Sequence, residues 1–99
     1  MSKQFSNDVN KKEMKVSNMT SHNGNTIPNQ FIITDGETEV FQSYHSVIVK
    51  KVGETIFLDE KYWDYSVTTS KYRNLFLGED KKATQKKIDT GIYTLCNLN

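Results

Sequence analysis

The chain has 99 residues and a formal net charge of +1, with 13 basic and 12 acidic side chains. Its length allows one domain with a modest core, and the charge balance excludes both an acidic DNA mimic and a histone-like binder. One cysteine excludes an internal disulfide and a cysteine-based zinc site. Without a membrane-length apolar stretch or a secretory signal, we expect a cytoplasmic protein.

Residues 1–24 are polar and rich in Ser, Asn and Lys, and their few apolar residues are scattered without a sustained period. Such a composition predicts a flexible N-terminal arm, with a short helix that orders on binding as a further option. A single domain is then expected over residues 25–99.

Strand-forming residues follow in three runs. Residues 29–34 contain several β-branched residues and one aromatic residue, and Asp35-Gly36 is a strong hairpin-turn signal. Residues 39–51 are rich in strand formers and predict one long central strand. After a turn at Gly53, residues 55–59 predict a third strand. Short turns between consecutive strands indicate an antiparallel meander.

Helical signals come next. Ser66, Thr68 or Thr69 can cap a helix whose apolar face includes Tyr72 and Phe76, and Gly78 is typical of its end. A second helix is expected over residues 81–90, and a final strand over residues 92–98. The predicted fold is α+β: a small antiparallel sheet, made of a three-strand meander plus a C-terminal strand, with two short helices packed on one face.

The aromatic run at residues 62–78 is the most informative stretch, because large aromatic groups supply both core and contact area. The guanidinium of Arg73, which lies in this run, can bind an anionic group through two parallel hydrogen bonds. The alternative is that the rings are simply core and that Arg73 pairs with Asp64 or Glu79. The candidate partner-binding residues are Trp63, Tyr65, Tyr72, Arg73, Lys71 and Asn74.

Catalytic signatures are missing from the sequence. His45 and Asp64 are the best single candidates for an acid or base, but no nucleophile motif, phosphate-binding loop or metal-ligand spacing accompanies them. We therefore expect a protein that is not an enzyme and holds no cofactor or metal.

Two other binding functions remain open. The basic residues of the two predicted helices suit phosphate contacts beside stacking aromatics, although acidic neighbours neutralise much of that charge. A small nucleic-acid-binding accessory protein is therefore an alternative. The amide-rich loop at residues 21–25, together with Arg73, allows a sponge that sequesters a nucleotide signal.

Several segments together resemble a family of small bacteriophage proteins without an assigned activity. They are residues 27–33 (IPNQFII), 41–44 (FQSY), 62–66 (YWDYS), 68–74 (TTSKYRN) and the closing 97–99 (NLN). The resemblance extends over residues 19–99 and implies a phage setting but no chemistry.

A small phage protein with an aromatic surface and no catalytic set is expected to be a binder. We therefore expect a non-catalytic, host-directed or anti-defence protein in the host cytoplasm, for example an inhibitor of a CRISPR effector. It would act through an aromatic and Arg anchor. The expected partner is a host protein and not a membrane. An open strand edge also leaves a homodimer as an option.

Overall fold

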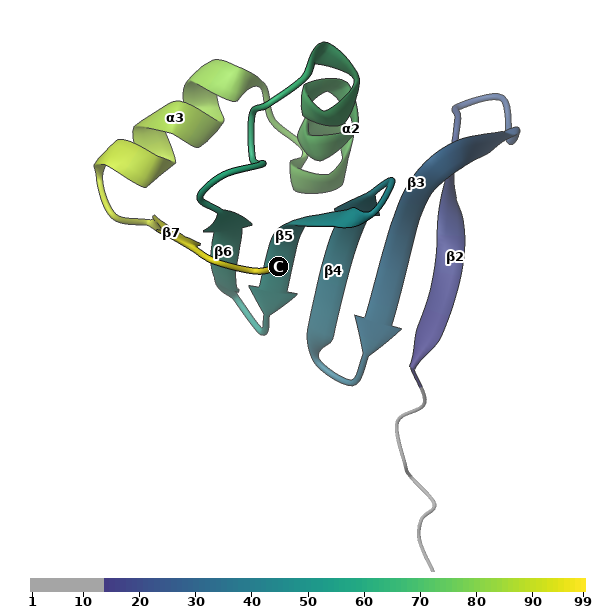
Figure 1. Ribbon diagram of the computed structural model, residues 1–99, viewed down its shortest axis with the longest axis horizontal. Helices are drawn as coiled ribbons and strands as arrows, with labels where there is room; N and C mark the ends of the chain where they lie inside the picture. Colours follow the sequence, from purple (N-terminus) through teal and green to yellow (C-terminus); the bar gives the residue numbers. More distant parts are fainter. Residues whose placement is uncertain (1–13) are drawn as a thin grey trace, which may run out of the picture.

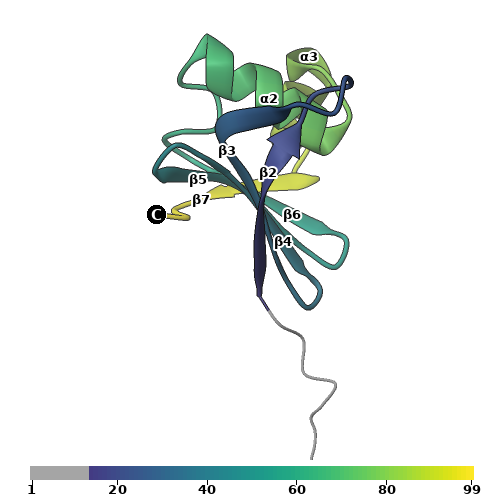
Figure 2. The same ribbon diagram turned by 90° about the vertical axis from the view of Figure 1, so that its right-hand side faces the viewer.

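The computed structural model describes residues 14–99, which form one six-stranded sheet and two helices (Figure 1). The spatial order of the strands follows the chain order, β2-β3-β4-β5-β6-β7. Both helices connect β6 to β7 and lie on one side of the twisted sheet (Figure 2). The elements are β2 (Lys15–Thr20), β3 (Thr26–Asp35), β4 (Thr38–Ser43), β5 (Ser46–Val52), β6 (Thr55–Asp59), α2 (Val67–Leu77), α3 (Lys81–Asp89) and β7 (Tyr93–Cys96).

The sheet is mixed. Strands β2 to β6 form an antiparallel meander, whereas β7 pairs with β6 in parallel, with Ile56 opposite Tyr93 and Leu58 opposite Leu95. Parallel neighbours cannot be joined by a tight turn, so the chain must cross over between them. The two helices make that crossover, in which α2 lies against β4 and α3 lies against β7.

The predicted small antiparallel sheet of four strands is therefore wrong in three respects. The described part of the predicted arm contributes strand β2, which pairs with β3 from Lys15–Thr34 to Thr20–Thr26. The predicted strand over residues 39–51 is two strands, and the final strand is parallel. Residues 1–13, the rest of the predicted arm, lie outside the described residues.

The reversal inside residues 39–51 takes place at Tyr44, whose backbone φ of 57° is left-handed. Ser43 pairs with Ser46 across this two-residue turn. Hairpin turns of this kind usually carry Gly, Asn or Asp, because a Cβ disfavours positive φ. Positions 44 and 45 are Tyr and His, so no turn signal marks this reversal.

Helix α2 begins after Ser66, one of the three predicted caps, and is followed by Gly78 as predicted, whereas α3 ends at Asp89, one residue before its predicted end. The hydroxyl of Ser66 accepts a hydrogen bond from the N–H of Thr69 (3.1 Å), and Gly78 ends α2 with a φ of 71°. Asp80 caps α3 by accepting from the N–H of Ala83 (2.9 Å). Among residues 14–99, no helix is long and apolar enough to cross a membrane.

The core lies between the helices and the sheet. Its fully buried members are Phe41, Ile48, Val49 and Leu58, with Tyr93 beside them. A bulge opposite Phe41 adds one residue to β5, so that Ile48 and Val49 are both buried. The ring of Phe76 on α2 stacks on Phe41 with centroids 5.8 Å apart. This contact anchors α2 over the middle of the sheet.

Candidate partner-binding site

The segment between β6 and α2, residues 60–66, is closed at its start by Asp59. This carboxylate is fully buried and accepts hydrogen bonds from the N–H groups of Lys61 (3.0 Å), Tyr62 (2.9 Å) and Leu98 (2.8 Å). Burial raises the pKa of Asp59, but these backbone N–H groups and the side chain of Asn99 outweigh it and leave the pKa below its ordinary value. Asp59 thus fixes how the aromatic run leaves the sheet.

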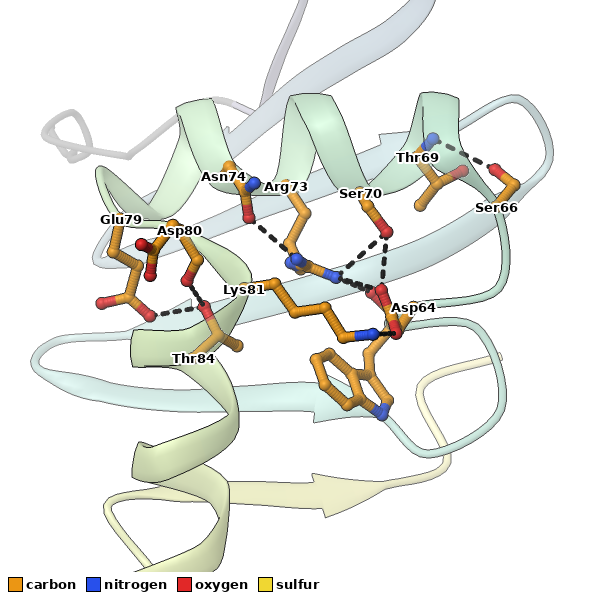
Figure 3. Close-up of polar contacts among 11 residues, drawn as sticks. Asp64, Ser66, Thr69, Ser70, Arg73, Asn74, Glu79, Asp80, Lys81 and Thr84 are labelled. Atoms are coloured by element: carbon orange, nitrogen blue, oxygen red, sulfur yellow. Dashed lines mark hydrogen bonds and ion pairs between the residues drawn. The ribbon is translucent and has the colours of Figure 1, made fainter.

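Arg73 holds the other end of this segment from inside the protein (Figure 3). Its Nη1 donates to the carbonyl of Trp63 (2.6 Å) and to Asp64 Oδ1 (3.1 Å), and its Nη2 donates to Asn74 Oδ1 (2.8 Å). The guanidinium also lies 5.1 Å from the centroid of the Trp63 ring, in cation–π range. A planar fork with several fixed donors is what Arg offers over Lys at such a position.

The Arg73 side chain has no exposed area, which corrects its predicted role as a contact residue. A partner that binds the surface cannot touch a fully buried guanidinium. Its Nε has no hydrogen-bond partner among the described residues, which adds a desolvation cost to the burial. Arg73 is therefore a positioning residue that fixes the shape of the surface above it.

Asp64 connects this buried network to the surface and to α3. Its carboxylate accepts from Ser70 Oγ (2.7 Å) and pairs with Lys81 Nζ (2.7 Å) as well as with Arg73. Burial raises the pKa of Asp64, but the hydrogen bonds from Lys81, Ser70 and Arg73 outweigh it, so the pKa lies below its ordinary value. The acid stays charged at neutral pH and holds the start of α3 near α2.

A shallow pocket of about 540 Å³ opens above this network, and we call it the α2 pocket. Tyr65 and Val67 form its apolar part, with 52% and 89% of their surfaces exposed. The Tyr65 ring is supported by an edge contact with Tyr62, centroids 5.2 Å apart. The lining residues are Asp64, Tyr65, Ser66, Val67, Ser70, Lys71, Asn74 and Lys81.

The structure brings only some of the predicted site residues to this pocket. Tyr65, Lys71 and Asn74 line it, and Lys71 also lies over the Tyr72 ring at 5.3 Å. Trp63 and Tyr72 are partly buried and pack against the hydrophobic core instead. Of the six candidate partner-binding residues, the pocket thus retains one aromatic residue, Tyr65, with Lys71 and Asn74 as its polar neighbours.

Other lining residues were not predicted. Val67 and Ser70 belong to the first turns of α2, and their outward position could have been read from the Ser66 cap and the helical period. Lys81 comes from α3, so only the packing of two helices brings it to the pocket. No sequence signal indicates that approach.

A second polar cluster holds α3 against β7. Glu79 accepts from Thr84 Oγ1 and from Lys87 Nζ, both at 2.6 Å, and Lys87 lies over the buried ring of Tyr93. Burial raises the pKa of Tyr93, and the nearby Glu79 raises it further. Because these groups bond to one another, they act as a structural connection.

Of the two residues named as acid or base candidates, Asp64 belongs to the ion-pair network described above, whereas His45 lies apart from it. His45 is exposed in the turn between β4 and β5, and His22 is exposed in the loop between β2 and β3. Within residues 14–99, no group of three or more His, Cys, Asp or Glu side chains is arranged to hold a metal ion.

The chain belongs to a family of unknown function, DUF8033, whose model matches residues 14–91. The match begins just before β2 and ends just before β7, so it includes every element of the α2 pocket. No curated protein and no solved structure matches the chain.

Proposed function

We propose that this member of a family of unknown function is a non-catalytic binding protein whose α2 pocket receives a side chain of a partner protein. The observation that carries the proposal is the exposure of Tyr65 and Val67 beside a pocket whose polar side chains are held by buried Arg73. Exposed aromatic and aliphatic groups on a rigid support are typical of interface anchors.

The polar groups of the pocket favour binding over catalysis. The Ser70 hydroxyl donates to Asp64, and the Ser66 hydroxyl accepts from the backbone of α2. Both hydroxyls are thus engaged in structural bonds, and the lining contains no His or Cys that would activate a nucleophile. Lys71 and the Nδ2 group of Asn74, whose Oδ1 accepts from Arg73, are left as polar contacts around an apolar anchor point.

The phage resemblance supplies the setting of the proposal. It supports a host-directed or anti-defence role in the host cytoplasm, with a bacterial protein as the partner and inhibition achieved by occupying its surface. Inhibition of this kind needs only a well-packed contact patch and no chemical step.

The test compares proteins captured from host lysate by the wild type, Tyr65→Ala and a matched control, Tyr44→Ala. Tyr44 is similarly exposed (46%) but lies in the β4–β5 turn, away from the pocket. We expect Tyr65→Ala to reduce recovery of the specific partner at least tenfold, whereas Tyr44→Ala leaves it unchanged. Equal recovery by all three proteins would refute the role of the pocket.

A second candidate function is supported by α3. A surface groove beside this helix is lined by Lys81, Lys82, Gln85, Lys86 and Asp89. Lys81 and Lys87 are already paired with Asp64 and Glu79, which leaves Lys82 and Lys86 as the stronger phosphate contacts. Titration of single- and double-stranded DNA over a range of salt concentration tests this function, because phosphate contacts give a steep dependence of affinity on salt.

A further inference from the structure

The sheet has a second face, opposite the helices. Directly paired residues point to the same face of a sheet. Val16 pairs with Ile33, Ile33 with Val40, and Val40 with Lys50, so these side chains share a face. Phe31 and Val47 both pair with Gln42 in the next row. The hydrophobic cluster of the described core, which packs against the helices, includes none of them.

This second face is apolar at its centre and carries a groove of about 370 Å³. Ile33, Val40 and Val47 lie along it, and Met14 at its margin is 64% exposed. Ile33, Val40 and Val47 are partly exposed among residues 14–99, and apolar side chains grouped in this way form a candidate interaction surface. The remaining lining residues are Asp35, Thr38, Lys50, Asn97 and Leu98.

The C-terminal residues give the groove a fixed side. Asn99 donates from Nδ2 to the carbonyl of Val47 (2.9 Å), and its Oδ1 accepts from the N–H of Val47 (2.7 Å). The N–H of Leu98 donates to Asp59 (2.8 Å). These bonds hold Leu98 beside Val47, so the groove has a defined shape before anything binds in it.

We propose that a second copy of this chain covers the face, so that two sheets pack against each other with the helices outside. Charge complementarity supports this occupant, because the groove carries one acid, Asp35, and one base, Lys50. A two-fold pairing presents the same patch from both copies, and an axis midway between the two residues places the Asp35 carboxylate of each copy opposite the Lys50 ammonium of the other. A strongly acidic partner would place negative charge opposite Asp35, and a strongly basic partner would place positive charge opposite Lys50.

The geometry of packed sheets agrees with this arrangement. Two sheets stack about 10 Å apart with side chains of their inner faces interdigitating. Valine, isoleucine and phenylalanine side chains of the second face suit such a layer. The helices that line the α2 pocket lie on the opposite side of the sheet (Figure 2), so this packing does not cover the pocket. The proposal is thus independent of what the α2 pocket binds.

The test measures the mass of the full-length chain by sedimentation equilibrium. We expect twice the monomer mass of 11.4 kDa. Val40→Lys places an unpaired charge at the centre of the face and should raise the dimer dissociation constant at least tenfold. Ile92→Lys, at an exposed site away from this face, is the matched control and should not change it. Circular dichroism verifies that each variant is folded.

A charge exchange distinguishes a second copy from other occupants. Asp35→Lys and Lys50→Asp should each weaken the dimer by placing like charges together, and the double variant should recover it. A wild-type chain that stays monomeric up to about 1 mM overturns the proposal, since even weak self-association is visible there. A dimer that Val40→Lys leaves unchanged overturns it as well. Monomers would point instead to residues preceding Met14, or to another protein, as the cover of this face.

Discussion

The guanidinium of Arg73 and the carboxylate of Asp64 form an ion pair of 3.1 Å in which the Arg side chain has no exposed area and the Asp side chain has 23%. The pair joins α2 to the segment that precedes it. Asp64 also pairs with Lys81 of α3, so its carboxylate connects α3 to the buried Arg73 of α2. The shape of the α2 pocket follows from this connection.

Replacement of Arg73 should therefore act on stability. We expect Arg73→Ala to lower the free energy of unfolding by about 3–5 kcal/mol, because it removes one partner of a buried pair. Arg73→Lys should also destabilise, since an ammonium cannot reach Trp63, Asp64 and Asn74 together. Urea denaturation of both variants measures the loss. Lys71→Ala, two residues away and exposed, is the control and should change stability by less than about 0.5 kcal/mol.

The pH dependence of stability should reflect Asp59. Its folded pKa is below the unfolded value, so its contribution is complete above the unfolded pKa and is lost as the pH falls through the folded pKa. We expect Asp59→Asn to lower the free energy of unfolding by about 1–3 kcal/mol at pH 7. The NH₂ group of Asn would replace a carboxylate oxygen that accepts hydrogen bonds from backbone N–H groups. The difference in free energy of unfolding between the wild type and Asp59→Asn should become smaller as the pH is lowered below about 4. Urea denaturation of both proteins at several pH values measures it, and a cost that is constant with pH would contradict this role.

Substitution of Tyr44 in the β4–β5 turn should increase the stability of the protein. The left-handed backbone at this position disfavours a residue with a bulky side chain, and Asn tolerates this conformation better. We expect Tyr44→Asn to raise the free energy of unfolding by about 0.5–1 kcal/mol, measured by thermal denaturation. Tyr65→Asn is the control: Tyr65 is similarly exposed but not left-handed, so no gain is expected there.

The sequence predicted those elements whose ends have local chemistry. The caps at Ser66 and Gly78 and the turns at Gly36 and Gly53 all depend on side chains or glycines at single positions. Strand β2 was missed because its side chains are exposed except for Met19, so no apolar period indicates it. The parallel pairing of β7 depends on the path of two helices, which no local signal encodes.

The site was predictable only in part for a similar reason. The exposure of Tyr65 agrees with its prediction as a contact residue, whereas the burial of Arg73 does not. A single Arg in the aromatic run has the same local sequence pattern whether its side chain is exposed or buried. What decides its position is the Trp63 carbonyl and ring on one side and the core beneath α2 on the other. Both are tertiary contacts.

The parallel pairing of β6 with β7 has a consequence for the order of folding. Strands β2 to β6 pair with their neighbours along the chain across short connections, whereas β7 can pair with β6 only after residues 60–92 have closed into a loop. We expect β7 and the residues after it to join late, and their amide hydrogens to exchange with solvent before those of β4 and β5.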